Sequence, residues 1–119
     1  MDIQMGAVES RFAEIIWECE PVLTTELVKM SEEALNWKKT TTYTVLKRLC
    51  EKGIFKNEGS TVTSIVSKDE FYSMRSERFV EEEFNGSLPA FLAAFTKRKS
   101  LSAEEIAALR RMVEEYEGE

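Results

Sequence analysis

Residues 36–53 read NWKKTTTYTVLKRLCEKG, and this stretch has two different faces if it forms a helix. At 100° per residue one face is apolar, and it consists of Thr42, Val45, Leu46, Leu49 and Cys50. The opposite face holds short hydroxyls and cations, and it consists of Thr40, Thr41, Thr44, Lys47 and Arg48. Gly53 stands where a helix C-terminal cap belongs. The pattern therefore predicts a helix with one buried side and one polar, basic side.

That polar side has two interpretations. A helix that enters the major groove of DNA needs small groups that reach base edges and cations that reach phosphates. A face rich in lysine and threonine is also common on helices that contact only solvent. The sequence around the helix has to decide between them.

Two further helices precede it. Residues 7–19 repeat apolar side chains at helical spacing, and the chain leaves this helix at Glu20-Pro21. Its predicted inner face is Val8, Phe12, Ile15, Ile16 and Cys19, with Trp17 at the edge. Residues 24–35 form the second predicted helix, capped by Thr24 or Thr25. Its inner face is Leu27, Met30, Ala34 and Leu35. Trp37 follows the second helix, and we expect it to fill the small core.

A β-hairpin is predicted after Gly53. Residues 54–58 and 61–66 are rich in β-branched and aromatic side chains, and Gly59-Ser60 between them is a two-residue turn signal. A short strand is also expected at residues 22–23, between the first two helices. Three helices followed by a hairpin is the order of a winged helix-turn-helix domain, in which the third helix reads DNA.

The charge is distributed in a way that fits this order. The 119-residue chain carries a formal charge of −6, which is unusual for a DNA-binding protein. Residues 36–56 nevertheless carry six cations and one anion, a local charge of +5, and the remaining residues sum to −11. Dissolved salt screens the repulsion between DNA and the acidic remainder of the chain, because the Debye length is about 8 Å at physiological salt.

The composition offers little for catalysis or metal binding. The chain has no histidine and two cysteines, Cys19 and Cys50, both on predicted apolar faces. We expect two buried, reduced thiols, no metal and no cofactor. No phosphate-binding glycine loop or nucleophile motif is present, so an enzyme is not expected. The chain has no apolar run of 18 residues and no signal-peptide pattern at its start, and we expect a cytoplasmic protein.

Three more helices are predicted in residues 68–119. Ser67 and Glu70 form a capping box for a helix that runs to about Asn85, and Gly86 ends it. Ser87 and Pro89 start the fifth helix, and a basic connector follows at residues 97–99. A second capping box, Ser102 with Glu105, starts the sixth. The expected fold is mainly α with a small β-hairpin wing: a winged domain in residues 1–67 and a helical domain in residues 68–119.

The apolar side chains of these last helices are too many for three short helices standing alone. Either a second copy shares one core with them, or they fold back on the winged domain. We favour the homodimer, because a small domain buries too little apolar surface by itself. A dimer would also place two reading helices on a palindromic DNA site. The expected dimerisation residues are Phe79, Phe84, Leu88, Phe91, Leu92, Phe95, Leu101, Ile106, Leu109, Met112 and Val113.

Taken together, the motifs resemble those of the BlaI/MecI/CopY (penicillinase repressor) family of bacterial winged-helix regulators. The resemblance runs nearly end to end and rests on six segments. They are Ile16-Trp17-Glu18, Thr25-Glu26-Leu27, the spacing of Trp37, Thr41, Thr44, Arg48 and Gly53, the run Val66 to Phe71 with Asn85-Gly86-Ser87-Leu88, and the run Leu101 to Arg110.

The resemblance implies a homodimeric transcriptional repressor that binds palindromic operator DNA. It places Thr41, Tyr43, Thr44 and Arg48 at the DNA, with threonines at base edges and cations at phosphates. With the basic patch, the expected DNA-binding residues are Lys38, Lys39, Thr40, Thr41, Tyr43, Thr44, Lys47, Arg48 and Lys56. The hairpin is shorter than is usual in the family and has Glu58 near its tip, so we expect the wing to contribute less than the third helix.

Family members differ in how repression is relieved. Some are cut in the fifth helix in a pathway that starts at a membrane metalloprotease sensor, and the corresponding bond here joins Ala94 to Phe95. The residue before the phenylalanine is asparagine in the familiar cut site and alanine here. Copper-responsive members end in a cysteine-rich tail, which this acidic C-terminus does not resemble.

The alternative function is a winged-helix module that docks an acidic protein partner through the same basic patch. A protein-docking face would be expected to expose aromatic or leucine side chains. The third helix exposes hydroxyls and cations instead, with Tyr43 on its flank.

Overall fold

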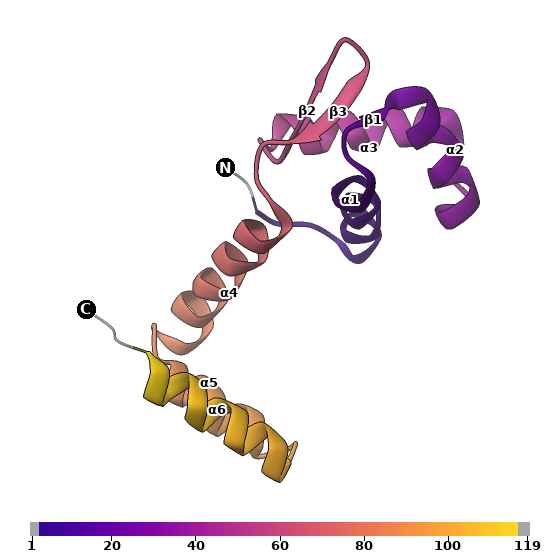
Figure 1. Ribbon diagram of the computed structural model, residues 1–119. Helices are drawn as coiled ribbons and strands as arrows, with labels where there is room; N and C mark the ends of the chain where they lie inside the picture. The colour runs from indigo at the N-terminus through magenta and orange to yellow at the C-terminus, as the bar shows by residue number, and fades with distance from the viewer. Residues whose placement is uncertain (1–2, 117–119) are drawn as a thin grey trace. The chain divides into compact units, whose positions relative to one another are not determined.

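The computed structural model of the protein describes residues 3–116 and contains the predicted order of elements (Figure 1). The elements are α1 (Ala7–Cys19), β1 (Val22–Leu23), α2 (Thr24–Leu35), α3 (Lys39–Glu51), β2 (Phe55–Glu58), β3 (Thr61–Ser64), α4 (Lys68–Phe84), α5 (Leu88–Thr96) and α6 (Ala103–Glu115). The chain forms two compact units that divide within α4, between Glu77 and Arg78. We call residues 3–77 the winged unit and residues 78–116 the helical unit. The expected functional boundary at residues 67 and 68, where α4 begins, stays a prediction.

The winged unit has a closed hydrophobic core. Each of α1, α2 and α3 turns one face inward, and the sheet and the start of α4 complete the enclosure. The fully buried large side chains are Phe12, Ile16, Leu27, Leu49, Ile54, Phe55, Val62 and Phe71. Burial of each of these side chains stabilises the winged unit by about 1.5–3 kcal/mol.

The hairpin of β2 and β3 forms the wing, and β1 joins it in a three-stranded antiparallel sheet of order β1-β3-β2. Phe55 pairs with Ser64 and Glu58 with Thr61, so Gly59 and Ser60 form the two-residue turn, both with positive φ. The predicted strand at residues 22–23 is confirmed as β1, where Val22 pairs with Val62. This pairing fastens the connection between α1 and α2 to the hairpin.

Two details of the first two helices differ from the prediction. Val8 was expected on the inner face of α1, but it is 51% exposed, because the core contact of this helix begins one turn later at Phe12. In α2 the expected inner residue Ala34 is exposed, and Ser31 is fully buried instead. The inner face of α2 is therefore rotated toward Leu27 and Ser31.

The predicted cap of α2 is wrong. Neither Thr24 nor Thr25 caps it: the N-cap residue is Leu23, which has no side-chain capping bond. Leu23 belongs to β1, so the helix starts directly from a paired strand. The backbone N–H of Thr24, in the first helical position, donates to the carbonyl of Ser60 at 2.9 Å. Strand pairing thus replaces the side-chain cap.

The first turns of α4 belong to the winged unit. Phe71 is buried, and the Tyr72 hydroxyl donates to the Glu14 carboxylate at 3.1 Å. Burial and this carboxylate raise the pKa of Tyr72. Lys68 pairs with the same carboxylate at 2.6 Å. The predicted cap at Ser67 forms, since its hydroxyl accepts from the Glu70 N–H, but the Glu70 carboxylate accepts from that hydroxyl instead of from the backbone.

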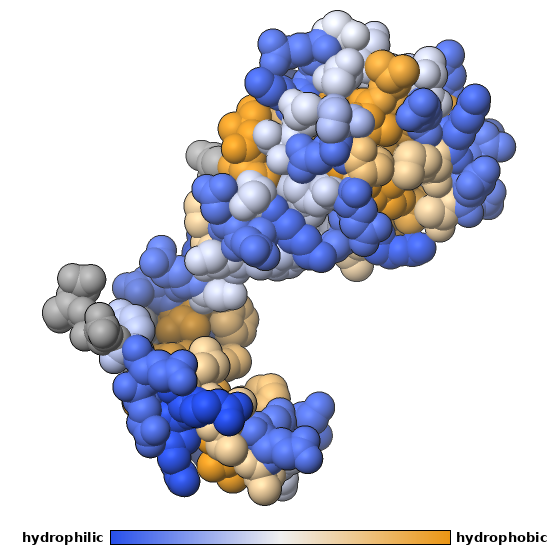
Figure 2. Space-filling view, viewed as in Figure 1, coloured by the Kyte–Doolittle hydropathy of each residue, from blue (hydrophilic) through white to orange (hydrophobic). Residues whose placement is uncertain are grey.

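The helical unit consists of the second half of α4 with α5 and α6. Asn85 and Gly86, both with positive φ, end α4, and the Ser87 hydroxyl caps α5 as predicted. Ser102 and Glu105 form the complete capping box expected for α6. Four phenylalanines form a cluster with ring centroids 5.4–6.1 Å apart: Phe79, Phe84, Phe91 and Phe95. No residue between 78 and 116 is buried, and Figure 2 shows apolar side chains open to view on this unit.

Candidate nucleic-acid interface

Helix α3 has the two faces that its sequence predicts. Thr42, Val45, Leu46 and Leu49 are buried against the core, and Cys50 is partly buried. On the opposite side all five predicted polar residues are exposed, namely Thr40, Thr41, Thr44, Lys47 and Arg48. Tyr43 is partly buried on the flank. The winged unit therefore presents one helix face of hydroxyls and cations to solvent.

The start of α3 is open to an anion. Asn36 ends α2 in the left-handed conformation, and Trp37 then packs on Phe12 with ring centroids 5.0 Å apart. The N-cap residue of α3 is Lys38, which makes no side-chain capping bond, and the first turn contains no acidic residue. Free amide N–H groups at a helix start attract anions, and Lys38 and Lys39 add positive charge there. The arrangement fits a phosphate.

The threonines of α3 are not equivalent. The Thr44 hydroxyl donates to the carbonyl of Thr40 at 2.8 Å, which uses its hydrogen. Its oxygen can still accept a hydrogen bond, and its methyl can pack against an apolar group. An exposed acceptor beside a methyl group suits a base edge that has an amino group or the thymine methyl. Thr42, in contrast, is buried and donates to the carbonyl of Lys38.

Several of the predicted cations already contact a carboxylate. Glu9 on α1 lies 3.7 Å from Arg48 and 3.6 Å from Lys52, and Lys52 also donates to the carbonyl of Gln4. In the hairpin, Lys56 pairs with Glu58 at 2.9 Å. The effective charge of the basic patch is therefore smaller than the residue count suggests. Sequence reasoning missed Glu9, because only the packing of α1 brings it beside α3.

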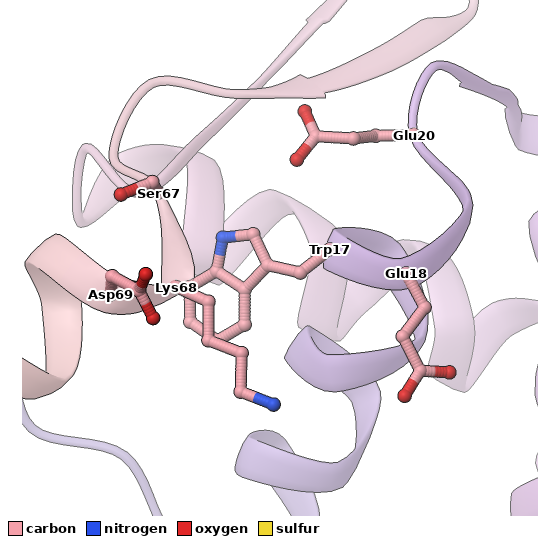
Figure 3. Close-up of a pocket in the computed structure, with 6 residues that line it drawn as sticks. All are labelled: Trp17, Glu18, Glu20, Ser67, Lys68 and Asp69. Carbon is pink, nitrogen blue, oxygen red and sulfur yellow. The ribbon is translucent and has the colours of Figure 1, made fainter.

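The winged unit also has a shallow pocket of about 290 Å³ beside the start of α4 (Figure 3). It is lined by Trp17, Glu18, Glu20, Ser67, Lys68 and Asp69. The Trp17 indole N–H donates to the carbonyl of Val66 at 3.0 Å, and the Glu20 carboxylate accepts from the N–H and hydroxyl of Ser64. These bonds join the C-terminal end of α1 to the hairpin and to the segment that leads into α4, so Trp17 and Glu20 serve the fold.

Neither of the two thiols is activated for reaction. Cys19 and Cys50 are free and only partly buried, although full burial was expected. Burial raises the pKa of both thiols, which keeps them protonated. Within residues 3–116, no group of cysteine and carboxylate side chains is arranged to hold a metal ion. Across the same residues, none of the helices is long and apolar enough to cross a membrane.

Comparison with known proteins identifies the relatives of this chain. The sequence profile of the penicillinase repressor family matches residues 5–115, which span both units. The chain belongs to the penicillinase repressor family. A curated relative, the penicillinase repressor of Bacillus licheniformis, is 27% identical over 117 residues, which cover 95% of this chain and 91% of the relative. The predicted family and the predicted winged-helix fold are both confirmed.

Membership in the penicillinase repressor family makes the chain a transcriptional repressor and points to a regulator rather than an enzyme. The expected dimerisation residues of this repressor all lie in the helical unit. Phe79, Leu88, Phe95, Ile106, Met112 and Val113 are 42–75% exposed, and Phe84, Phe91, Leu92, Leu101 and Leu109 are partly buried. The bond between Ala94 and Phe95 lies near the C-terminal end of α5, and both residues are exposed.

Proposed function

We propose that the protein represses transcription by binding palindromic operator DNA as a homodimer, with α3 of each chain in a major groove. The observation that carries this proposal is the exposed face of α3, which combines three threonines with Lys47 and Arg48. Duplex DNA offers phosphates to the cations and base edges to the hydroxyls.

The proposed contacts divide by chemistry. Lys38 and Lys39, beside the uncapped helix start, and Lys47, Arg48 and Lys56 would contact phosphates and set the position of the helix. The groups proposed to face base edges are Thr40, Thr41, Tyr43 and Thr44. Phosphate contacts dominate affinity and its salt dependence, whereas the hydroxyls and methyls discriminate between sequences.

The helical unit, which falls within the proposed dimerisation domain of residues 68–119, would supply the dimer. Its exposed apolar side chains favour association, because a second copy would remove them from water at about 25 cal/mol per Å². A twofold symmetric dimer would place two α3 helices about 34–36 Å apart, one turn of duplex. Operator symmetry would then follow from protein symmetry.

We further propose that proteolysis between Ala94 and Phe95, in a pathway that starts at a membrane-sensor metalloprotease, relieves repression. A cut there would separate α6 from the rest of the helical unit and so remove Ile106, Leu109 and Met112 from the shared core. Loss of one dimer-forming helix would separate the two chains and their α3 helices. Operator affinity would then fall, because the second α3 would no longer be held close to its half-site by the first.

The decisive experiment measures binding of the purified protein to the DNA upstream of its own gene and to a scrambled duplex. Fluorescence anisotropy over a salt series would be combined with molar mass by light scattering. We expect a dimer that prefers the upstream duplex and loses affinity steeply as salt rises. A dimer without any sequence preference would contradict the proposal and favour the docking of an acidic protein partner.

A further inference from the structure

Glu9 is an acidic residue placed against the basic C-terminal end of α3, beside Arg48 and Lys52. It stands in the first turn of α1, where its Oε1 accepts a hydrogen bond from the Gly6 N–H at 3.3 Å. Its Oε2 lies 3.7 Å from Nη1 of Arg48 and 3.6 Å from Nζ of Lys52. One carboxylate oxygen is thus shared between two cations at the end of the reading helix.

The contact with Arg48 is loose. The Oε2 atom of Glu9 is buried and accepts no hydrogen bond from any described residue, and 3.7 Å exceeds the 2.7–3.2 Å of a protein hydrogen bond. The side chain of Arg48 is 52% exposed, whereas that of Lys52 is 16% exposed and donates to the carbonyl of Gln4. Arg48 is therefore the cation that is free to leave.

A phosphate offers Arg48 a better partner than Glu9 does. A guanidinium can form two parallel charge-assisted hydrogen bonds with a phosphate, and such bonds are stronger than a loose ion pair. While Arg48 stays near Glu9, however, the negative charge of the carboxylate offsets part of its attraction for DNA. The two anions compete for one guanidinium.

We infer that Glu9 is an internal competitor for DNA phosphate at Arg48 and thereby limits the affinity of the protein for DNA. This inference rests on the proposed function and adds a residue that does not itself contact DNA. In the free protein, Arg48 is held near Glu9. In the DNA complex, Arg48 binds a phosphate instead.

The test compares Glu9→Gln with Glu18→Gln. Glu9→Gln removes the charge but keeps a side-chain oxygen for the Gly6 N–H, so the start of α1 should fold as before. Glu18→Gln makes the same change in net charge on the exposed end of the same helix, about 13 Å further along its axis. Both variants would be checked by circular dichroism before DNA binding is measured.

We expect Glu9→Gln to bind both upstream and scrambled duplex about two- to fivefold more tightly than the unmodified protein, the effect that partly exposed charge pairs typically give. Its affinity should also fall more steeply with salt, because no carboxylate at residue 9 takes up a cation when Arg48 moves to the phosphate, so the net release of ions is larger. Glu18→Gln should change binding by less than half as much on a logarithmic scale. In an Arg48→Gln background, Glu9→Gln should lose most of its effect.

Three outcomes would overturn the inference while leaving the proposed function intact. They are unchanged binding by Glu9→Gln, equal gains for the two glutamine variants, and weaker binding by Glu9→Gln, which would mean that Glu9 positions Arg48 instead of competing for it. If the unmodified protein binds no DNA, the proposed function itself fails, and this inference fails with it.

Discussion

The winged unit and the helical unit are both rich in apolar side chains but use them differently. Every buried hydrophobic side chain of the described chain lies between Ile3 and Phe71, whereas residues 78–116 contain none. Phe12 in the first unit is fully enclosed, and Phe79 in the second is 50% exposed. The winged unit completes its core within one chain, whereas the helical unit leaves large apolar side chains exposed.

This difference separates two roles that one helix connects. The first turns of α4 are fixed to the winged unit through Phe71, Tyr72 and Lys68. Its second half carries Phe79 and Phe84 into the phenylalanine cluster. Under the proposed function, the part that reads DNA is stable by itself, and the part that joins two copies depends on protein concentration.

The largest expected effect comes from removing a core side chain of the winged unit. Phe12→Ala should lower the free energy of unfolding by about 3–5 kcal/mol, because a fully buried ring leaves a cavity and Trp37 loses its contact. Urea unfolding followed by tryptophan fluorescence would measure it. The loss should be the same at all protein concentrations, and a loss that disappears at high concentration would contradict a self-contained winged core.

A second variant tests the helical unit. Phe79→Ala should weaken dimerisation by about 2 kcal/mol, the scale of an aromatic anchor in an interface, and sedimentation equilibrium would measure the dissociation constant. Ile65→Ala is the matched control, since Ile65 is 56% exposed but belongs to the winged unit. Equal effects of the two substitutions would show that exposure alone, and not the unit, decides the outcome.

A third pair of variants compares α3 with the hairpin as proposed DNA contacts of the winged unit. Arg48→Ala should weaken DNA binding by about 1 kcal/mol, whereas Lys56→Ala should cost less than half of that. Lys56 is held at 2.9 Å by Glu58, and the hairpin is short. Anisotropy titrations at fixed salt would rank the two variants. A larger loss for Lys56→Ala would mean that the wing, and not α3, dominates the grip on DNA.

The smallest expected effect concerns one imperfection in the winged core. The Ser31 hydroxyl is fully buried and has no hydrogen-bond partner among residues 3–116. Ser31→Ala should therefore raise the free energy of unfolding by up to about 1 kcal/mol, because a buried hydroxyl without a partner is costly. Thermal unfolding of Ser31→Ala and of the unmodified protein, under the same conditions, would measure the change. A clear decrease would indicate that the hydroxyl has a partner in solution.

The sequence by itself determined the helices, the hairpin and the face of α3. Each of these depends on neighbours within a few residues: the 3.6-residue period, the Gly59-Ser60 turn, the Ser67 cap of α4 and the capping box of α6. Local signals were unreliable where a helix meets another element. The cap of α2 was wrong because β1 pairing starts that helix, and Val8 and Ala34 were misplaced because periodicity does not fix where the core contact begins and ends.

Only the tertiary structure decided which charges are available on the proposed DNA-binding surface. The sequence lists six cations in residues 36–56, but it cannot show that Glu9, 39 residues before Arg48, lies within 4 Å of it and of Lys52. The physical reason is that a side-chain charge acts over a few ångströms in space, and distance along the chain does not predict distance in the fold. The same holds for burial in the helical unit. The sequence shows where its apolar side chains lie along each helix, but only the folded structure shows that none of residues 78–116 is buried.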